Sequence, residues 1–559
     1  MKILIKITFL ILFIVAFSSC ESFLVEKPYS FPEASTLFEN PKNAELALTG
    51  LYDVLNAPNI QGTGDNPLWG RGIHYILGLG NDELIGDLKG LTDPEASIMT
   101  SYSFNSESKY LSEAWFGLYV GVNRANSILK YVPNIAEMDS VRKEQMIGEA
   151  HFFRAFYLTY LSWVFGGVPL PTDFAVDANA PRKPLSEVYP YIIEDFKLAI
   201  QKLPARNTVT GRINKYTAQT MLAKVYLYLA SCKENQVGST LDNEYNKFDF
   251  VDQADCYQNC YNLCDSVYKN SGYKLNPNYN YLFIADTKNL KAELISEVIM
   301  GVNAGTGGSN EYYSYAYLSG PQGNVNTTGG NYGRLRPLGE LALKYNILND
   351  NRALQNITGN TSTTLTQIIL NVKYYNANTV ASAGNNFCLG KFRQSDPVSR
   401  TALGIPTYAS TLSFPILRFA DLILMYAEAS YKVKGNDVDA RNLLVDIRKR
   451  AALGDATKLE ALTLAYQKTD FMEELLDERA RELCGESWRR IDLMRLGKLE
   501  QVVTNLSTVR IGTTNPNYFY WNVQYASVIK NNFQPYKIWF PIPKRELETN
   551  TNLKQNFGY

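Results

Sequence analysis

Histidine is nearly absent from this sequence, which has only His74 and His151 among its 559 residues. Metal sites in proteins are usually built from closely spaced histidines and cysteines, with imidazole the commonest ligand. The two histidines lie far apart in the chain and form no such pair. The sequence therefore predicts no metal centre and no cofactor.

Net charge is also absent, because 55 Lys and Arg residues balance 55 Asp and Glu residues. Proteins that bind nucleic acid carry a basic surface, and long-range steering of an acidic substrate needs an excess of positive charge. The composition supplies neither. We therefore expect no nucleic-acid partner.

Cysteines are few, and six of them follow Cys20 in the chain. Three lie in the stretch DCYQNCYNLCD, where spacing by four residues places them on one face of a helix. A metal site would need a fourth ligand, and side chains four residues apart on a helix are poorly aimed for a disulfide. A small apolar face in the interior is the expected role of this group, Cys256, Cys260 and Cys264.

Long apolar runs are missing except at the start of the chain. There, Lys2 and Lys6 precede residues 7–17, which are apolar except for Thr8, and Ser18, Ser19 and Cys20 follow. The run is shorter than the roughly 20 residues that a membrane-spanning helix needs, and its flanks are those of a secretory signal peptide. The ending FSSC resembles the lipobox of bacterial lipoproteins, which predicts an acylated Cys20; an ordinary cleaved signal is the alternative.

What the sequence has in abundance is helical periodicity. Apolar residues recur at helical spacing in six segments before residue 271, and alternating Ala with larger residues favours close packing of helix on helix. We expect a mainly α scaffold of helical pairs similar to tetratricopeptide repeats. The six segments are residues 43–55, 111–131, 144–164, 188–203, 215–231 and 257–268.

Between about Gly272 and Pro415 the composition changes to Gly, Asn, Thr, Ser and Tyr. A segment this long and rich in glycine is usually functional or disordered, and its tyrosines favour a functional, loop-rich lobe. The whole chain has 38 tyrosines, whose rings offer an apolar face and a polar tip for recognition.

Helices return after residue 413, in segments rich in Arg and Glu. In FPILRFADLILMYAEASYKVKG, helical spacing predicts a seam of ion pairs formed by Arg418, Asp421, Glu428 and Lys432 on an otherwise buried helix. Mixed charges in DARNLLVDIRKRAAL and MEELLDERARELCGESWRRIDLMRLGKL predict two further helices laced by salt bridges.

Five stretches, in this order along the chain, resemble hallmarks of the SusD/RagB family of outer-membrane lipoproteins: RAFYLTYLSWVFGGVPL, ILRFADLILMYAEA, IRKRAAL, LDERARELCGESWRRIDLMRLG and PIPKRELETNTNLKQNFGY. The resemblance implies a SusD-like fold, no catalytic activity, and a lipid-anchored position facing outward from the cell surface. It also implies an oligosaccharide ligand and a SusC-like TonB-dependent transporter as partner.

The resemblance and the composition together divide the chain into five parts. These are a signal peptide (1–19), a lipidated cysteine with its tether (20–40), an N-terminal helical region (41–270), a loop-rich ligand-facing lobe (271–415) and a C-terminal helical region with its tail (416–559).

Two glycine-rich stretches have the composition of a sugar site, which needs exposed rings beside polar groups. These are GTGDNPLWGRGIHYILGLGNDE and SNEYYSYAYLSG. We expect them to form one shallow, exposed surface, although such rings can equally pack loops onto the core. The candidate ligand-binding residues are Trp69, Arg71, His74, Tyr75, Asn81, Asp82, Tyr312, Tyr313, Tyr315 and Tyr317.

Three other function classes remain open at this point. A secreted glycoside hydrolase would need two carboxylates about 5 to 10 Å apart in a cleft, and Asp82 and Glu83 are candidates. A peptide could replace the glycan, which would make the protein the lid of a peptide importer. A pure tetratricopeptide-like scaffold would need neither the lipid anchor nor the tyrosine-rich lobe.

Overall fold

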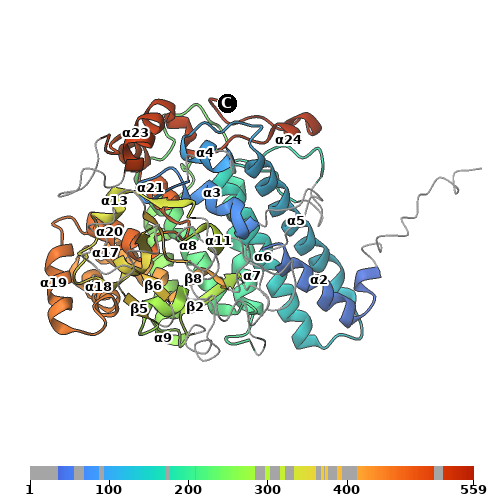
Figure 1. Ribbon diagram of the computed structural model, residues 1–559. Helices are drawn as coiled ribbons and strands as arrows, with labels where there is room; N and C mark the ends of the chain where they lie inside the picture. The colour runs from blue at the N-terminus through green and yellow to red at the C-terminus, as the bar shows by residue number, and fades with distance from the viewer. Residues whose placement is uncertain are drawn as a thin grey trace, which may run out of the picture.

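The structure is a computed structural model (Figure 1), and it describes these residues: 36–55, 68–86, 94–171, 177–207, 209, 211–283, 296–302, 315–320, 333–359, 367–369, 372–374, 387–392, 412–508 and 520–559. Cys20 lies outside them. In this part of the chain no helix has both the length and the apolar character that crossing a bilayer requires.

A row of helices forms the scaffold (Figure 1), and each helix packs against the next one in the row. All six helices predicted from apolar spacing are confirmed. They are α2 (Pro41–Asp53), α5 (Lys109–Tyr131), α6 (Ser140–Phe165), α7 (Leu185–Lys202), α8 (Lys215–Glu234) and α9 (Gln253–Asn270).

The row continues with α17 (Phe419–Lys434), which packs directly against α9, and then with α18 (Val438–Ala451) and α19 (Ala456–Tyr466). The loop-rich segment predicted at 271–415 thus leaves the row after α9 and returns to it at α17. Its two ends are held together by a strand pair, β2 (Val298–Val302) with β8 (Phe414–Arg418).

Three helices of the row are buried on nearly every side: α6 from Met146, α8 from Thr217 to Cys232, and α17 from Phe419 to Ser430. Helices that are apolar all round need such positions. The close approach of α5 and α6 depends on Gly121, because a Cβ there would lie 2.3 Å from the Tyr157 ring.

The remaining described elements are short. The strands pair antiparallel in twos, β1 (Leu84–Gly86) with β3 (Leu335–Pro337), β4 (Ile357–Gly359) with β7 (Phe387–Leu389), and β5 (Gln367–Ile369) with β6 (Val372–Tyr374). The other helices are η1 (Thr36–Phe38), η2 (Leu68–Gly72), α3 (Ile73–Gly78), α4 (Pro94–Thr100), η3 (Val132–Asn134), η4 (Tyr279–Phe283), α11 (Tyr315–Leu318), α13 (Gly339–Ala342), α14 (Asn351–Asn356), α20 (Phe471–Leu483), α21 (Arg489–Arg495), α22 (Leu499–Thr504), α23 (Tyr520–Asn532), η6 (Pro535–Ile538) and α24 (Lys544–Thr549).

Two expectations for the C-terminal helices are wrong. The segment beginning at Phe414 starts as strand β8, so Arg418 precedes α17 instead of lying on it. The segment 472–499 is broken between α20 and α21, because Gly485 and Ser487 have positive φ angles of 74° and 67°. No helix continues through two residues in that conformation.

The predicted salt bridges of the Arg- and Glu-rich helices are present, but they are buried and join different elements. Arg418 contacts Glu297, Glu482 and Glu486, and Arg450 contacts Glu297 and Glu482. This Arg/Glu network ties the loop-rich segment to α18 and α20.

The predicted seam of ion pairs along α17 is also wrong in its pairing. Asp421 binds Lys224 of α8, Glu428 binds Arg495 of α21, and Lys432 binds Glu234. The reason is that α17 is surrounded by other helices, so its charged side chains meet partners across each interface before they meet one another.

Candidate functional site

The first predicted stretch forms η2, α3 and β1. Both η2 and α3 pack against α5, α3 also contacts α21, and every residue of α3 is buried. Arg71 alone among the candidates of this stretch is half-buried. The expectation of an exposed surface is therefore wrong for most of the stretch.

Trp69 and Tyr75 belong to the core. The Trp69 indole is 1% exposed and stacks on Phe156 at 5.4 Å, with Tyr160 edge-on at 5.0 Å. Tyr75 is completely buried against Tyr110. Composition alone could not show that these rings are buried. A ring that packs a glycine-rich turn onto a core looks the same in sequence as a ring that binds a sugar.

His74 is buried and uncharged. Its Nε2 lies 2.5 Å from the Trp69 carbonyl oxygen, which can only accept, so Nε2 donates; Nδ1 then accepts from the Ser487 hydroxyl at 2.7 Å. Burial lowers the pKa of His74 to about 3. The side chain thus joins the α3 turn to the break before α21, a structural role.

Asn81 and Asp82 are also internal. The Asn81 Oδ1 accepts from the backbone N–H of Glu83, and Asp82 accepts two hydrogen bonds from Arg489 at 2.7 and 2.6 Å. Burial by itself would raise the pKa of Asp82, but Arg489 and Lys344 offset this effect and the pKa lies below its ordinary value. Asp82 is a paired anion of the scaffold.

The carboxylate pair considered for hydrolysis does not form a catalytic arrangement. Burial raises the pKa of Glu83 to about 8, while Asp82 is neutralised by its ion pair. The two side chains are only 3% and 4% exposed. A polysaccharide cannot reach acids in this position.

The mid-chain stretch meets the first one at Tyr315. This ring is 1% exposed, lies 4.0 Å from the His74 ring and donates its hydroxyl hydrogen to the Gly485 carbonyl. The structure therefore brings the two predicted stretches together, but through buried rings. Tyr312, Tyr313 and the side chain of Tyr317 lie outside the described residues.

A small internal cavity of about 10 Å³ lies beside this junction, between His74, Phe414 and Trp488. That space holds at most one water molecule. No sugar ring fits into this space. The buried part of the predicted stretches therefore fills the protein interior and does not form a binding pocket.

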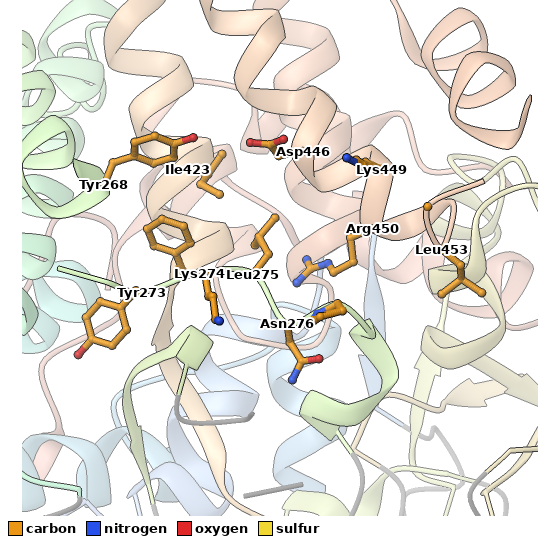
Figure 2. A pocket seen from close by; sticks show the side chains of 13 residues that line it. Tyr268, Tyr273, Lys274, Leu275, Asn276, Ile423, Asp446, Lys449, Arg450 and Leu453 are labelled. Carbon is orange, nitrogen blue, oxygen red and sulfur yellow. The ribbon is translucent and has the colours of Figure 1, made fainter. Parts of the chain in front are cut away.

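An open cleft of about 590 Å³ lies elsewhere, where α9, α17 and α18 meet (Figure 2). Its volume is in the range of small-molecule sites. The segment that follows α9 closes one side. The lining residues are Tyr268, Tyr273, Lys274, Leu275, Asn276, Pro277, Phe419, Ile423, Asp446, Lys449, Arg450, Leu453 and Gly454.

Aromatic and cationic groups share this cleft. Tyr268 stacks on Phe419 with ring centres 5.6 Å apart, and Figure 2 shows it facing Asp446. Arg450 reaches from α18 toward the segment of Leu275 and Asn276. The sequence reasoning missed this site. The only local signal is SGYKLNP, with a tyrosine and a lysine directly after a helix end; the remaining walls come from helices distant in sequence.

Metal binding finds no support among the described residues, which contain no group of three or more His, Cys, Asp or Glu side chains placed to hold an ion. The cysteines of α9 are buried, as predicted, and Cys260 and Cys264 are completely inaccessible.

Two sequence profiles match the chain. The one described as the SusD family covers residues 296–559, and the one described as starch-binding, associating with outer membrane, covers residues 91–227. Together they include the Arg/Glu network and most of the helical row.

Individual proteins resemble the chain over nearly its full length. SusD-like protein P25 of Formosa agariphila is 25% identical, with 97% of each chain aligned. The starch-binding protein SusD of Bacteroides thetaiotaomicron is 24% identical, covering 82% of this chain and 81% of its own. A solved laminarin-binding SusD-like protein superposes with a TM-score of 0.65 at 22% identity, covering 93% of this chain and all of that one. The last likeness shows the fold, which is the predicted mainly α, SusD-like one.

Proposed function

Because the chain belongs to the SusD/RagB family, we propose that it is an outer-membrane lipoprotein that binds oligosaccharides and passes them to a SusC-like TonB-dependent transporter. Relatives with similar folds are named for binding starch and laminarin. Their names describe binding and not turnover, and the buried state of Asp82 and Glu83 fits a protein without catalytic activity.

One geometric observation carries the proposed ligand site. The two predicted stretches, residues 62–83 and 309–320, meet where His74 and Tyr315 touch. Tyr312 and Tyr313 precede Tyr315 by three and two residues in the sequence. We assign the first contacts with a glycan to Tyr312, Tyr313 and Tyr317, with Arg71 as the polar partner.

The test is calorimetry with the chain from Glu21 onward, which keeps every described residue, after a glycan array has identified a ligand. We expect micromolar to millimolar affinity, about 4 to 8 kcal/mol, since a carrier must release its cargo. Replacing Tyr312 and Tyr313 with Ala should weaken binding about tenfold or more. Phe250→Ala removes an exposed ring and serves as the control.

The outcomes separate the alternatives. If the Tyr312/Tyr313 variant binds the glycan with full affinity, the binding site lies elsewhere. Binding of peptides without glycans would make the protein a peptide carrier, and release of reducing ends from the bound glycan would make it a hydrolase.

Lipid attachment and transport are tested separately. Cys20→Ala should release the protein from membranes, and its melting temperature, measured beside that of the parent, checks that the fold is intact. Membrane retention by this variant would contradict the proposal. Isolation of the native protein from outer membranes should recover a TonB-dependent barrel in the same complex, and a protein isolated alone would contradict the transfer step.

A further inference from the structure

The cleft between α9, α17 and α18 is distinct from the proposed loop site, and its charge is locally unbalanced. Lys274 and Lys449 are exposed and form no ion pair within the described part of the chain, whereas Arg450 is paired with Glu297 and Glu482. Asp446 is the only acid of the lining, and burial together with the nearby Asp446 carboxylate raises the pKa of Tyr268. The cleft therefore has an excess of positive charge in a protein whose net charge is zero.

Two buried donors in the lining have no acceptor among the residues that the structure describes. The Arg450 Nη atoms are used by Glu297 and Glu482, which leaves Nε without a partner. The Asn276 carboxamide accepts from the backbone of Asn278 but its Nδ2 has no acceptor among the described residues. Arg450 is 5% exposed and Asn276 is inaccessible. Both N–H groups therefore lie beneath the surface of the cleft, where they add to the positive potential that an anion meets.

The walls of the cleft suit a sugar ring. Tyr268 stacks on the buried Phe419 ring with planes 15° apart, and Tyr268, Tyr273 and Leu275 are the half-buried apolar side chains of the lining. The C–H face of a pyranose packs on such rings. A neutral sugar would leave the lysines without a partner.

We propose that this cleft is a second saccharide site and that it selects an acidic sugar, whose carboxylate or sulfate oxygens meet Lys274 and Lys449. The proposal rests on the proposed glycan binding and extends it to a site on the helical row. Charge-assisted hydrogen bonds of this kind are about twice as strong as neutral ones.

The test compares three ligands of equal length by calorimetry on the chain from Glu21 onward: oligogalacturonate, a carrageenan oligosaccharide and a neutral laminari-oligosaccharide. We expect an acidic ligand to bind at least about tenfold more tightly than the neutral one, which is about 1.4 kcal/mol. The first two ligands distinguish carboxylate from sulfate. Affinity for the acidic ligand should fall between about 0.1 M and 1 M NaCl, because the Debye length shortens from about 10 Å to 3 Å.

Lys274→Ala/Lys449→Ala should weaken the acidic ligand about tenfold and leave the neutral ligand unchanged. Both lysines are exposed and unpaired, so this variant should keep its melting temperature. The control is Lys42→Ala/Lys197→Ala, which removes the same charge from exposed positions on α2 and α7.

Equal affinity for acidic and neutral ligands would overturn the inference, and so would an unchanged affinity in the cleft variant. Either result leaves the proposed function standing if any glycan binds. Failure to bind any saccharide on a broad array would instead contradict the proposed function itself.

Discussion

Trp69 packs between Phe156 and Tyr160 of α6 and hydrogen-bonds through its carbonyl to His74. At the scale of single residues, its role is thus set by neighbours from a helix far along the chain. The same holds for Tyr315, whose ring fills the space between His74, Phe392 and Phe414.

Trp69→Ala should lower the free energy of unfolding by about 3 to 5 kcal/mol, because it opens a cavity in a packed core. Chemical denaturation measures this loss. The fraction that stays folded should bind oligosaccharide with unchanged affinity, and Trp69→Phe should recover part of the stability. A fully stable Trp69→Ala protein that no longer binds would return this ring to the ligand site.

At the scale of elements, α17 is held from several sides, because it packs against α8, α9, α18 and α20. Its apolar residues are buried on all sides, and its acids reach α8, α20 and α21. The Glu428 carboxylate accepts from both Nη atoms of Arg495 and from Ser231. Such a pair fixes the position of α21 against the row.

Glu428→Ala should therefore destabilise the protein by about 3 to 5 kcal/mol, since it leaves the Arg495 charge buried without a partner. The matched control is Lys432→Ala, one turn further along α17, whose pair with Glu234 is partly exposed; its cost should stay below about 1 kcal/mol. Thermal melts compare the two. Equal losses would contradict a buried role for Glu428, and a stable Glu428→Ala protein that fails to bind ligand would assign it to the site.

The contact between α5 and α6 gives a second prediction at this scale. Gly121→Ala places a methyl group where the Tyr157 ring already lies, so the helices must separate at a cost of about 1 to 3 kcal/mol. Gly50→Ala in α2 is the control, because its new Cβ meets only Arg124 at 3.8 Å and alanine favours a helix. Destabilisation by Gly50→Ala as large as that by Gly121→Ala would contradict the packing argument.

At the scale of the whole molecule, carboxylates of α20 and α21 form ion pairs among the C-terminal helices and, from α20, with the loop-rich segment. Burial opposes their ionisation, but the surrounding cations outweigh it and lower the pKa of Asp477 and Asp492 to about 2. The pKa values of Glu478 and Glu482 lie well below their ordinary range for the same reason. Each of these groups is more acidic in the folded chain than in the unfolded one.

Stability should consequently fall in acid. A carboxyl with a lowered folded-state pKa stabilises the protein fully above its unfolded pKa, about 4, and this contribution disappears as the pH falls toward 2. The midpoint of urea unfolding, measured from pH 7 to pH 2, should drop mainly below pH 4. A flat profile through this window would contradict the ion-pair assignment.

Glu83 provides the control, because its pKa is shifted upward to about 8 by burial. A raised folded-state pKa gives stability that is complete below the unfolded pKa, about 4.3, and is lost as the pH rises through 8. Glu83→Gln should leave the acid side of the profile unchanged and reduce the loss between pH 5 and pH 8.

The sequence by itself determined the helices of the row and the family. Apolar spacing is a local property, so it located α2, α5, α6, α7, α8 and α9, and the resemblance followed from residues of the scaffold. The sequence also predicted the salt bridges of the C-terminal segments, because helices that carry side chains of both charges form ion pairs. The interior position of the α9 cysteines followed from their spacing by four.

Only the tertiary structure decided which rings are buried, which charges pair and where a cleft opens. Burial and pairing depend on contacts between distant segments, as when Tyr315 meets His74 or Glu428 meets Arg495. For the same reason a chain of zero net charge gathers Lys274, Lys449 and Arg450 around one cleft, since α9 and α18 become neighbours only when the row is assembled against α17.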